Sequence, residues 1–164
     1  MYKISFMVTQ MNKIQSIPTH PTPYPGINTV LHVLLKNVQT VLGNHFIGMY
    51  VYGSLASGDF DPQHSDIDFL VVTADTLPDE MIAVLKAMHD RITASGLKWA
   101  KKLEGSYISQ HTLRRYELPD APRPYVNEGS FYLARYGNEW TLERYIIREQ
   151  GIVVTGPAPP ADLN

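Results

Sequence analysis

Helix-like and strand-like patterns alternate along the sequence, and this alternation limits the folds that the chain can adopt. Residues 28–43 place apolar side chains at the spacing of an amphipathic helix. Two short apolar runs, rich in β-branched and aromatic residues, follow at residues 45–52 and 67–73. A second helical pattern occupies residues 77–96. Elements in this order pack as helical layers against a sheet, so we expect an α/β (α+β) fold.

The second half of the chain continues the alternation less regularly. We expect a third strand at residues 102–110, a helix at residues 139–150 and a terminal strand at residues 152–156. Residues 111–130 contain three prolines and many polar groups, which favour loop with one short helix.

Length and composition favour a single globular domain. The chain has 164 residues, of which 44% are hydrophobic and 18% charged, which suits one core rather than two. Residues 17–27 contain four prolines, so residues 1–27 are expected to form an extended leader. The domain is expected at residues 28–159, with a short tail at residues 160–164.

Composition also argues against several classes of protein. The chain has no cysteine, which excludes a disulfide scaffold, a thiolate nucleophile and a cysteine-type zinc site. Its net charge of −2, with scattered Lys and Arg, does not indicate an extended nucleic-acid surface, and a small-molecule or nucleotide substrate fits better. No stretch approaches the roughly 18 apolar residues of a membrane span, and no secretory signal is visible. A cytoplasmic location is therefore the expectation.

Two aspartates at the head of the second apolar run are poorly suited to a buried strand. Residues two apart in a strand share a face, so Asp66 and Asp68 should project together, with their roots roughly 6–7 Å apart. Carboxylates beside an apolar core are costly unless a positive group lies between them. There is no Lys or Arg from Tyr50 through Glu80. A divalent cation is the simplest candidate, and oxygen ligands favour Mg²⁺ or Mn²⁺ over zinc.

A simpler interpretation of an aspartate at this position is a turn cap, in which Ser65 completes a local hydrogen-bond network. That interpretation suits one aspartate better than a pair on one face. The Gly-Ser turn before the pair also favours a ligand site. Gly53 would let the backbone approach a ligand closely, and Ser54 would offer a hydroxyl and backbone N–H groups to a phosphate.

These residues resemble the signature of the DNA polymerase β-like nucleotidyltransferase superfamily. The resemblance is carried by Gly53-Ser54, by SDID at residues 65–68 and by the apolar strand that follows. It implies a nucleotidyltransferase fold, in which helices flank a small mixed β-sheet.

The resemblance also implies roles for individual residues. The family pattern expects a third carboxylate on an adjacent strand, and Glu104 is the only acidic residue in the predicted strand at residues 102–110. The implied nucleotide-binding residues are Gly53, Ser54 and Ser65, and the implied metal-binding and catalytic residues are Asp66, Asp68 and Glu104.

A finer resemblance is to the N-terminal domain of aminoglycoside nucleotidyltransferases of the streptomycin/spectinomycin adenylyltransferase type. It covers residues 28–159 and includes the strand with Glu104 and the segment at residues 139–159. It implies Mg²⁺-dependent transfer of AMP from ATP to a hydroxyl of a small molecule, with Glu104 as the catalytic base. Such enzymes continue into a C-terminal helical domain, which we expect to be missing after Asn164.

Two other functions remain open at this stage. Short members of the superfamily serve as antitoxins that adenylylate a partner protein, and the length of this chain suits that role. The chain could alternatively be a truncated domain that binds nucleotide without turnover. A homodimer could supply the other wall of the cleft. A polymerase role is disfavoured because no basic stripe accompanies the site.

Overall fold

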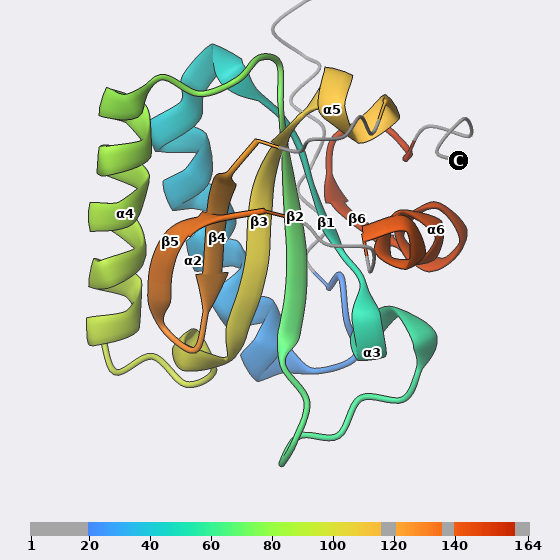
Figure 1. The fold of residues 1–164 in the computed structure, drawn as a ribbon. Helices are drawn as coiled ribbons and strands as arrows, with labels where there is room; N and C mark the ends of the chain where they lie inside the picture. The colour runs from blue at the N-terminus through green and yellow to red at the C-terminus, as the bar shows by residue number, and fades with distance from the viewer. Residues whose placement is uncertain (1–19, 116–120, 136–139, 160–164) are drawn as a thin grey trace, which may run out of the picture.

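A six-stranded mixed sheet lies between helices in the computed structural model, which describes residues 20–115, 121–135 and 140–159 (Figure 1). The helices are α2 (Pro25–Leu42), α3 (Gly53–Ser57), α4 (Asp79–Ala94), α5 (Gln110–Arg114) and α6 (Trp140–Gln150). The strands are β1 (Phe46–Val51), β2 (Ile67–Thr73), β3 (Leu103–Ser109), β4 (Arg123–Asn127), β5 (Ser130–Ala134) and β6 (Ile152–Thr155). The expected α/β fold with a small mixed sheet is confirmed.

The order of strands in the sheet is β5-β4-β3-β2-β1-β6. Strands β2 and β3 pair in parallel, and the other neighbouring pairs are antiparallel. Helix α4 makes the crossover that returns the chain to the same edge of the sheet. The starts of β2 and β3 and the end of β1 therefore lie together at one edge.

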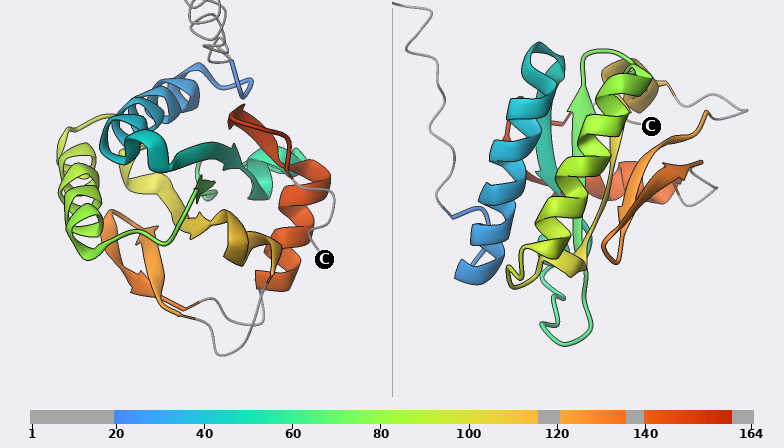
Figure 2. Two further views of the ribbon diagram at one scale, coloured as in Figure 1. Left: turned by 90° about the horizontal axis from the view of Figure 1, so that it is seen from above. Right: turned by 90° about the vertical axis from the view of Figure 1, so that its left-hand side faces the viewer.

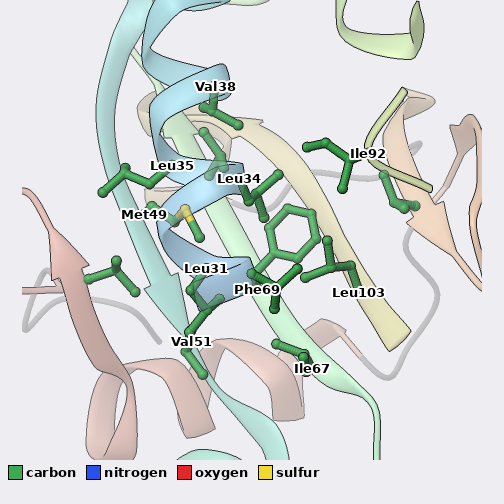
Figure 3. Packing of buried hydrophobic residues seen from close by; sticks show 14 of the residues in the cluster. Leu31, Leu34, Leu35, Val38, Met49, Val51, Ile67, Phe69, Ile92 and Leu103 are labelled. Atoms are coloured by element: carbon green, nitrogen blue, oxygen red, sulfur yellow. The ribbon is translucent and has the colours of Figure 1, made fainter. Parts of the chain in front are cut away.

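Helices α2 and α4 cover one face of the sheet, and α6 lies on the other (Figure 2). The first hydrophobic layer lies between the sheet and helices α2 and α4. Figure 3 shows Phe69 of β2 in this layer, near Leu34 of α2 and Leu103 of β3, all of them buried. The second hydrophobic layer, on the face that carries α6, is smaller and includes Leu70 of β2 and Trp140 of α6. Residues 67, 69 and 71 face the first layer and residues 70 and 72 face the second, as the period of two in a strand requires.

Helix α2 begins at Pro25, earlier than the predicted start at Asn28. Proline is well suited to the first helical position, because the N–H that it lacks has no partner there. Asn28 is buried inside the helix, and its side chain accepts a hydrogen bond from Thr22 N (2.9 Å) and donates one to Thr22 O (2.8 Å). Between Thr22 and Ile27, the prolines were therefore misleading as a sign of a poorly packed chain.

The hairpin of β4 and β5 begins within residues 111–130, where we expected loop, and replaces the last part of it. Its turn places Glu128 at φ 48° and Gly129 at φ 81°. Pro124 lies within β4, but the antiparallel pairing of β4 with β3 is limited to Val126 and Tyr125, so the N–H that proline lacks interrupts no bond there. The short helix expected in this segment is present as α5.

The remaining predicted elements are found close to their expected positions. Residues 45–52, 67–73, 77–96, 102–110 and 152–156 correspond to β1, β2, α4, β3 and β6. Most of the predicted leader (residues 1–19), the start of the predicted helix at Glu139 and the tail at residues 160–164 lie outside the described residues. Within the described part of the chain, no helix combines the length and apolar character needed to cross a bilayer.

Candidate functional site

The candidate site lies at the edge of the sheet where β2 and β3 begin. In the parallel ladder Asp68 is paired directly with Glu104. The two side chains project from the face that also carries Leu70 and Ile108, which is the face covered by α6. Neighbouring strands lie about 4.8 Å apart, so the register alone brings these two carboxyl groups side by side.

Asp66 joins the pair from just outside the strand. We expected Asp66 within the strand, but β2 begins at Ile67. The Asp66 carboxyl still lies close enough to hydrogen-bond with Glu104. Its Oδ1 is also 3.9 Å from Nζ of Lys102. The sequence window from Tyr50 to Glu80 had suggested that no side chain could supply a positive charge, and the fold brings one from the turn before β3.

Crowding of negative charge perturbs two of the carboxyl groups. Burial, together with the nearby charges of Glu104, Asp66 and Glu143, raises the pKa of Asp68 to about 7. The pKa of Glu104 is also raised, first by burial and then by Asp66, while a hydrogen bond from Tyr125 lowers it. The site therefore holds more negative charge than its own side chains stabilise.

Gly53 lies directly against Asp68. Its φ is +64°, and a Cβ placed on Gly53 would lie 2.0 Å from Asp68 Oδ2. The backbone N–H of Tyr52 donates to Asp68 O at 3.0 Å, which ties the end of β1 to the start of β2. Glycine is thus required both for its backbone conformation and for its lack of a side chain. Ser54 follows in the first turn of α3 and is partly exposed beside this contact.

Ser65 takes part in a local turn. Its hydroxyl accepts a hydrogen bond from Asp61 N (2.9 Å), and its own N–H donates to Asp61 O (2.8 Å). The turn cap considered in the sequence analysis is thus present at Ser65. It is built around Asp61 rather than around Asp66 and Asp68. The role of Ser65 in nucleotide binding stays a prediction.

Three residues near the carboxylates were not predicted from the sequence. Tyr125 of β4 donates a hydrogen bond from its phenol to Glu104 Oε1. Glu143 of α6 lies close enough to Asp68 and Tyr125 to raise the pKa of both. The third residue is Lys102, whose Nζ lies 3.9 Å from Asp66 Oδ1. Tyr125 could have been found only if β4 had been predicted, because its role depends on its position in the sheet.

Asp66, Asp68 and Glu104 are each only partly buried. The side chain of Asp66 is 36% exposed and that of Lys102 42% exposed. Within residues 20–115, 121–135 and 140–159, no three His, Asp or Glu side chains are already arranged to hold one metal ion. The donor chemistry nevertheless suits a hard cation, because the converging groups are carboxylates with an excess of negative charge.

Two cavities lie elsewhere. One, of about 240 Å³, is lined by residues from the far ends of β2 and β3, including Thr73 and Ser109. The other, of about 120 Å³, lies between Tyr50, Leu113 and Pro157. Neither is lined by the carboxylates.

Comparison with known proteins relates the chain to enzymes that transfer nucleotides. The family model described as "Nucleotidyltransferase domain" matches residues 35–124, more than half of the chain. The spectinomycin 9-adenylyltransferase of Enterococcus faecalis is 29% identical over 141 residues, which are 86% of this chain and 47% of the relative. The chain thus spans about half the length of this curated relative.

The chain is also similar to solved structures, among them the following two. A crystal structure of a spectinomycin adenyltransferase from Enterococcus, with ATP and spectinomycin, superposes with a TM-score of 0.59 at 19% identity, over 81% of this chain and 60% of that one. A toxin-antitoxin structure with AMP-PNP gives a TM-score of 0.41 at 19% identity, over 77% of this chain and 73% of that one. The second similarity is too low to support an inference.

The match includes the Gly-Ser turn, the aspartate pair and the strand that carries Glu104. It extends across the parallel β2–β3 unit that brings these residues together. The chain therefore belongs to the nucleotidyltransferase-domain family and is a homologue of the adenylyltransferases.

Proposed function

We propose that the protein transfers a nucleoside monophosphate, AMP from ATP, to a hydroxyl group of a small molecule in a reaction that depends on Mg²⁺ or Mn²⁺. The observation that carries this proposal is the pairing of Asp68 with Glu104 across the parallel strands, with Asp66 beside them. The Gly53–Asp68 contact places the Gly-Ser turn at the same edge.

Asp66, Asp68 and Glu104 are the residues that would hold the metal. When bound, the metal would neutralise charge on the triphosphate and activate the acceptor oxygen. The raised pKa of Asp68 supports this assignment, because a carboxyl group with that environment gains most from a nearby cation. Gly53 and Ser54 would contact the phosphates, with Ser65 as a further candidate.

Glu104 would act as the general base. The acceptor oxygen attacks the α-phosphorus of ATP, the bond from that phosphorus to the β-phosphate oxygen breaks, and pyrophosphate leaves. The proton of the acceptor hydroxyl passes to the Glu104 carboxylate. Burial and Asp66 raise the pKa of Glu104, which moves a carboxylate toward the range useful for proton transfer near neutral pH.

An aminoglycoside or a related aminocyclitol is the acceptor class that we propose to test first. The basis is the similarity to a spectinomycin 9-adenylyltransferase over 86% of this chain. Adenylylation of a partner protein, and nucleotide binding without turnover, remain hypotheses from the sequence. The experiment below distinguishes transfer to a small molecule from both of these alternatives.

The test is ATP- and Mg²⁺-dependent release of pyrophosphate with spectinomycin, streptomycin and related compounds, with the product identified by mass spectrometry. The expected result is an acceptor-dependent release that yields an adenylylated product. Asp75→Asn, at an exposed aspartate outside the site, is the control for Asp68→Asn. Tight ATP binding without release on any acceptor would contradict the proposal and favour a nucleotide-binding domain.

A further inference from the structure

Tyr125 contacts the proposed general base directly. Its phenol Oη donates a hydrogen bond to Glu104 Oε1. The register of the sheet explains why. Tyr125 is paired with Ser106 in the antiparallel β3–β4 ladder, and Glu104 and Ser106 lie on the same face of β3. Tyr125 therefore projects on the side of the sheet that carries the carboxylates, one diagonal step from Glu104.

The hairpin holds Tyr125 from both flanks. Its backbone lies between β3 and β5, where its partner is Tyr132. The Tyr125 and Tyr132 rings pack with their centroids 5.5 Å apart and an interplanar angle of 67°. Edge-to-face packing of this kind restricts the ring. The phenol is thus presented to Glu104 by a strand and a neighbouring ring rather than by a free side chain.

The electrostatic surroundings make this hydrogen bond important to Glu104. Burial and Asp66 both disfavour the charged form of Glu104, whereas the Tyr125 bond favours it. The nearby ammonium group of Lys102 lies 3.9 Å from Asp66. Burial, and then the contact with Glu104, raises the pKa of Tyr125, so its phenol remains protonated and able to donate.

We propose that Tyr125 is the positioning residue for Glu104: its phenol holds Oε1 and thereby fixes the direction in which Oε2 points, toward the acceptor hydroxyl. This inference rests on the proposed function, in which Glu104 receives the proton of that hydroxyl. A base must lie within hydrogen-bond reach of the proton that it takes. Fixing one carboxylate oxygen limits rotation of the other, and such supporting contacts typically contribute to activity without touching the substrate.

The first test is spectroscopic and needs no acceptor. The protein is labelled with ¹³C at the glutamate side-chain carboxyl groups, and the Glu104 resonance is identified as the one lost in Glu104→Gln. Tyr125→Phe removes only the hydroxyl and should shift this resonance. Tyr132→Phe is the matched control, because it removes the hydroxyl of the neighbouring ring and should leave the resonance in place.

The second test is kinetic. Tyr125→Phe should lower kcat for nucleotidyl transfer by roughly 10- to 100-fold, with the KM for ATP unchanged, while Tyr132→Phe retains wild-type kcat. In the Glu104→Gln background, Tyr125→Phe should cause no further loss, because a residue that acts through Glu104 has nothing left to position. Thermal unfolding of each variant shows whether its fold is retained.

The outcomes separate this inference from the proposed function. An unshifted Glu104 resonance in Tyr125→Phe overturns the inference whatever the activity. A shifted resonance with an unchanged kcat also overturns it. So does a Tyr125→Phe substitution that lowers kcat by the same factor in the Glu104→Gln protein as in wild type. A wild-type protein that transfers nucleotide to no acceptor contradicts the proposed function, and the NMR comparison then decides whether Tyr125 fixes the Glu104 carboxyl group.

Discussion

Gly53 and Asp68 are in such close contact that a methyl group on Gly53 would lie 2.0 Å from Asp68 Oδ2. The Gly-Ser turn and the aspartate pair are separated in the sequence by a loop, yet they form a single contact in the fold. Any side chain at residue 53 must displace the Asp68 carboxyl group. The backbone at residue 53, with φ +64°, would also be strained by any Cβ.

Gly53→Ala should therefore lose transfer activity by roughly 100-fold, because a displacement of about 1 Å at a reacting group can cost that much. The strain should also lower the free energy of unfolding by about 1–2 kcal/mol. Gly58→Ala is the control, since Gly58 has φ +86° but nothing within 4 Å of an added Cβ. Equal activity of the two variants, measured by pyrophosphate release, would contradict the importance of the Asp68 contact.

Asp68→Asn should abolish transfer and leave the fold intact. It should also stabilise the metal-free protein above pH 7. Because burial raises the folded-state pKa of Asp68 from 3.8 to about 7, this group favours folding at low pH, and its contribution is lost as the pH rises from about 4 through about 7. Asparagine at residue 68 cannot ionise, so the Asp68→Asn protein does not lose this stability as the pH rises. Thermal unfolding at pH 8 in the presence of a chelator should show a higher Tm for Asp68→Asn than for wild type; a lower Tm would argue against crowded negative charge at the site.

Divalent metal should stabilise the wild-type protein more than it stabilises Asp68→Asn. Mg²⁺ or Mn²⁺ that binds the folded wild-type protein raises its Tm in proportion to the logarithm of metal concentration. Asp68→Asn should show a much smaller rise, and Asp75→Asn a rise equal to that of wild type. Calcium at the same ionic strength tests the preference for a small cation. If neither Mg²⁺ nor Mn²⁺ changes the Tm of the wild-type protein, the result would count against metal binding by these carboxylates.

His89 should make the protein sensitive to acid. It is 2% exposed, and its Nε2 lies 2.7 Å from the hydroxyl of Tyr107. Burial lowers its pKa from 6.5 to about 4, although Asp90 opposes this shift. The neutral form is favoured in the folded state, so this contribution is complete above pH 6.5 and is lost as the pH falls toward 4. The loss is on the order of 3 kcal/mol.

This prediction can be checked by denaturant unfolding between pH 7 and pH 4. His89→Gln cannot become cationic and can still hydrogen-bond to Tyr107, so its stability should fall less steeply over this range. Parallel pH profiles for the two proteins would show that other groups cause the acid sensitivity.

The elements with strong local periodicity could be predicted from the sequence. The strand that begins at Ile67 and the helix that follows Pro78 lie within a residue or two of their predicted bounds. Local rules also explain why Asp66 and Asp68 were expected together. Their neighbour Glu104 was assigned through family resemblance. Its pairing with Asp68 depends on the register of two strands joined by a helix, which no local pattern determines.

The residues that the sequence did not reveal all depend on distant pairing. Tyr125 lies in a segment, residues 111–130, whose three prolines made it resemble a loop. It reaches Glu104 only because β4 pairs with β3. Lys102 lies far from Asp66 in the sequence and is brought near by the crossover. Glu143 acts across the layer between α6 and the sheet. Tertiary contacts of this kind cannot be derived from local propensity.

The parallel pairing of β2 with β3 has a consequence for how the gene can vary. Asp68 and Glu104 are located by strand register, while the loops at residues 58–66 and 95–99 lie outside the paired strands. Insertions at the exposed tip near Gln63 or beside Gly96 should be tolerated, because exposed loop tips accept added length at little entropic cost. A deletion of one residue inside β3 would instead turn Glu104 to the opposite face. Length variation among natural relatives should therefore concentrate in these two loops and be absent from the paired strands.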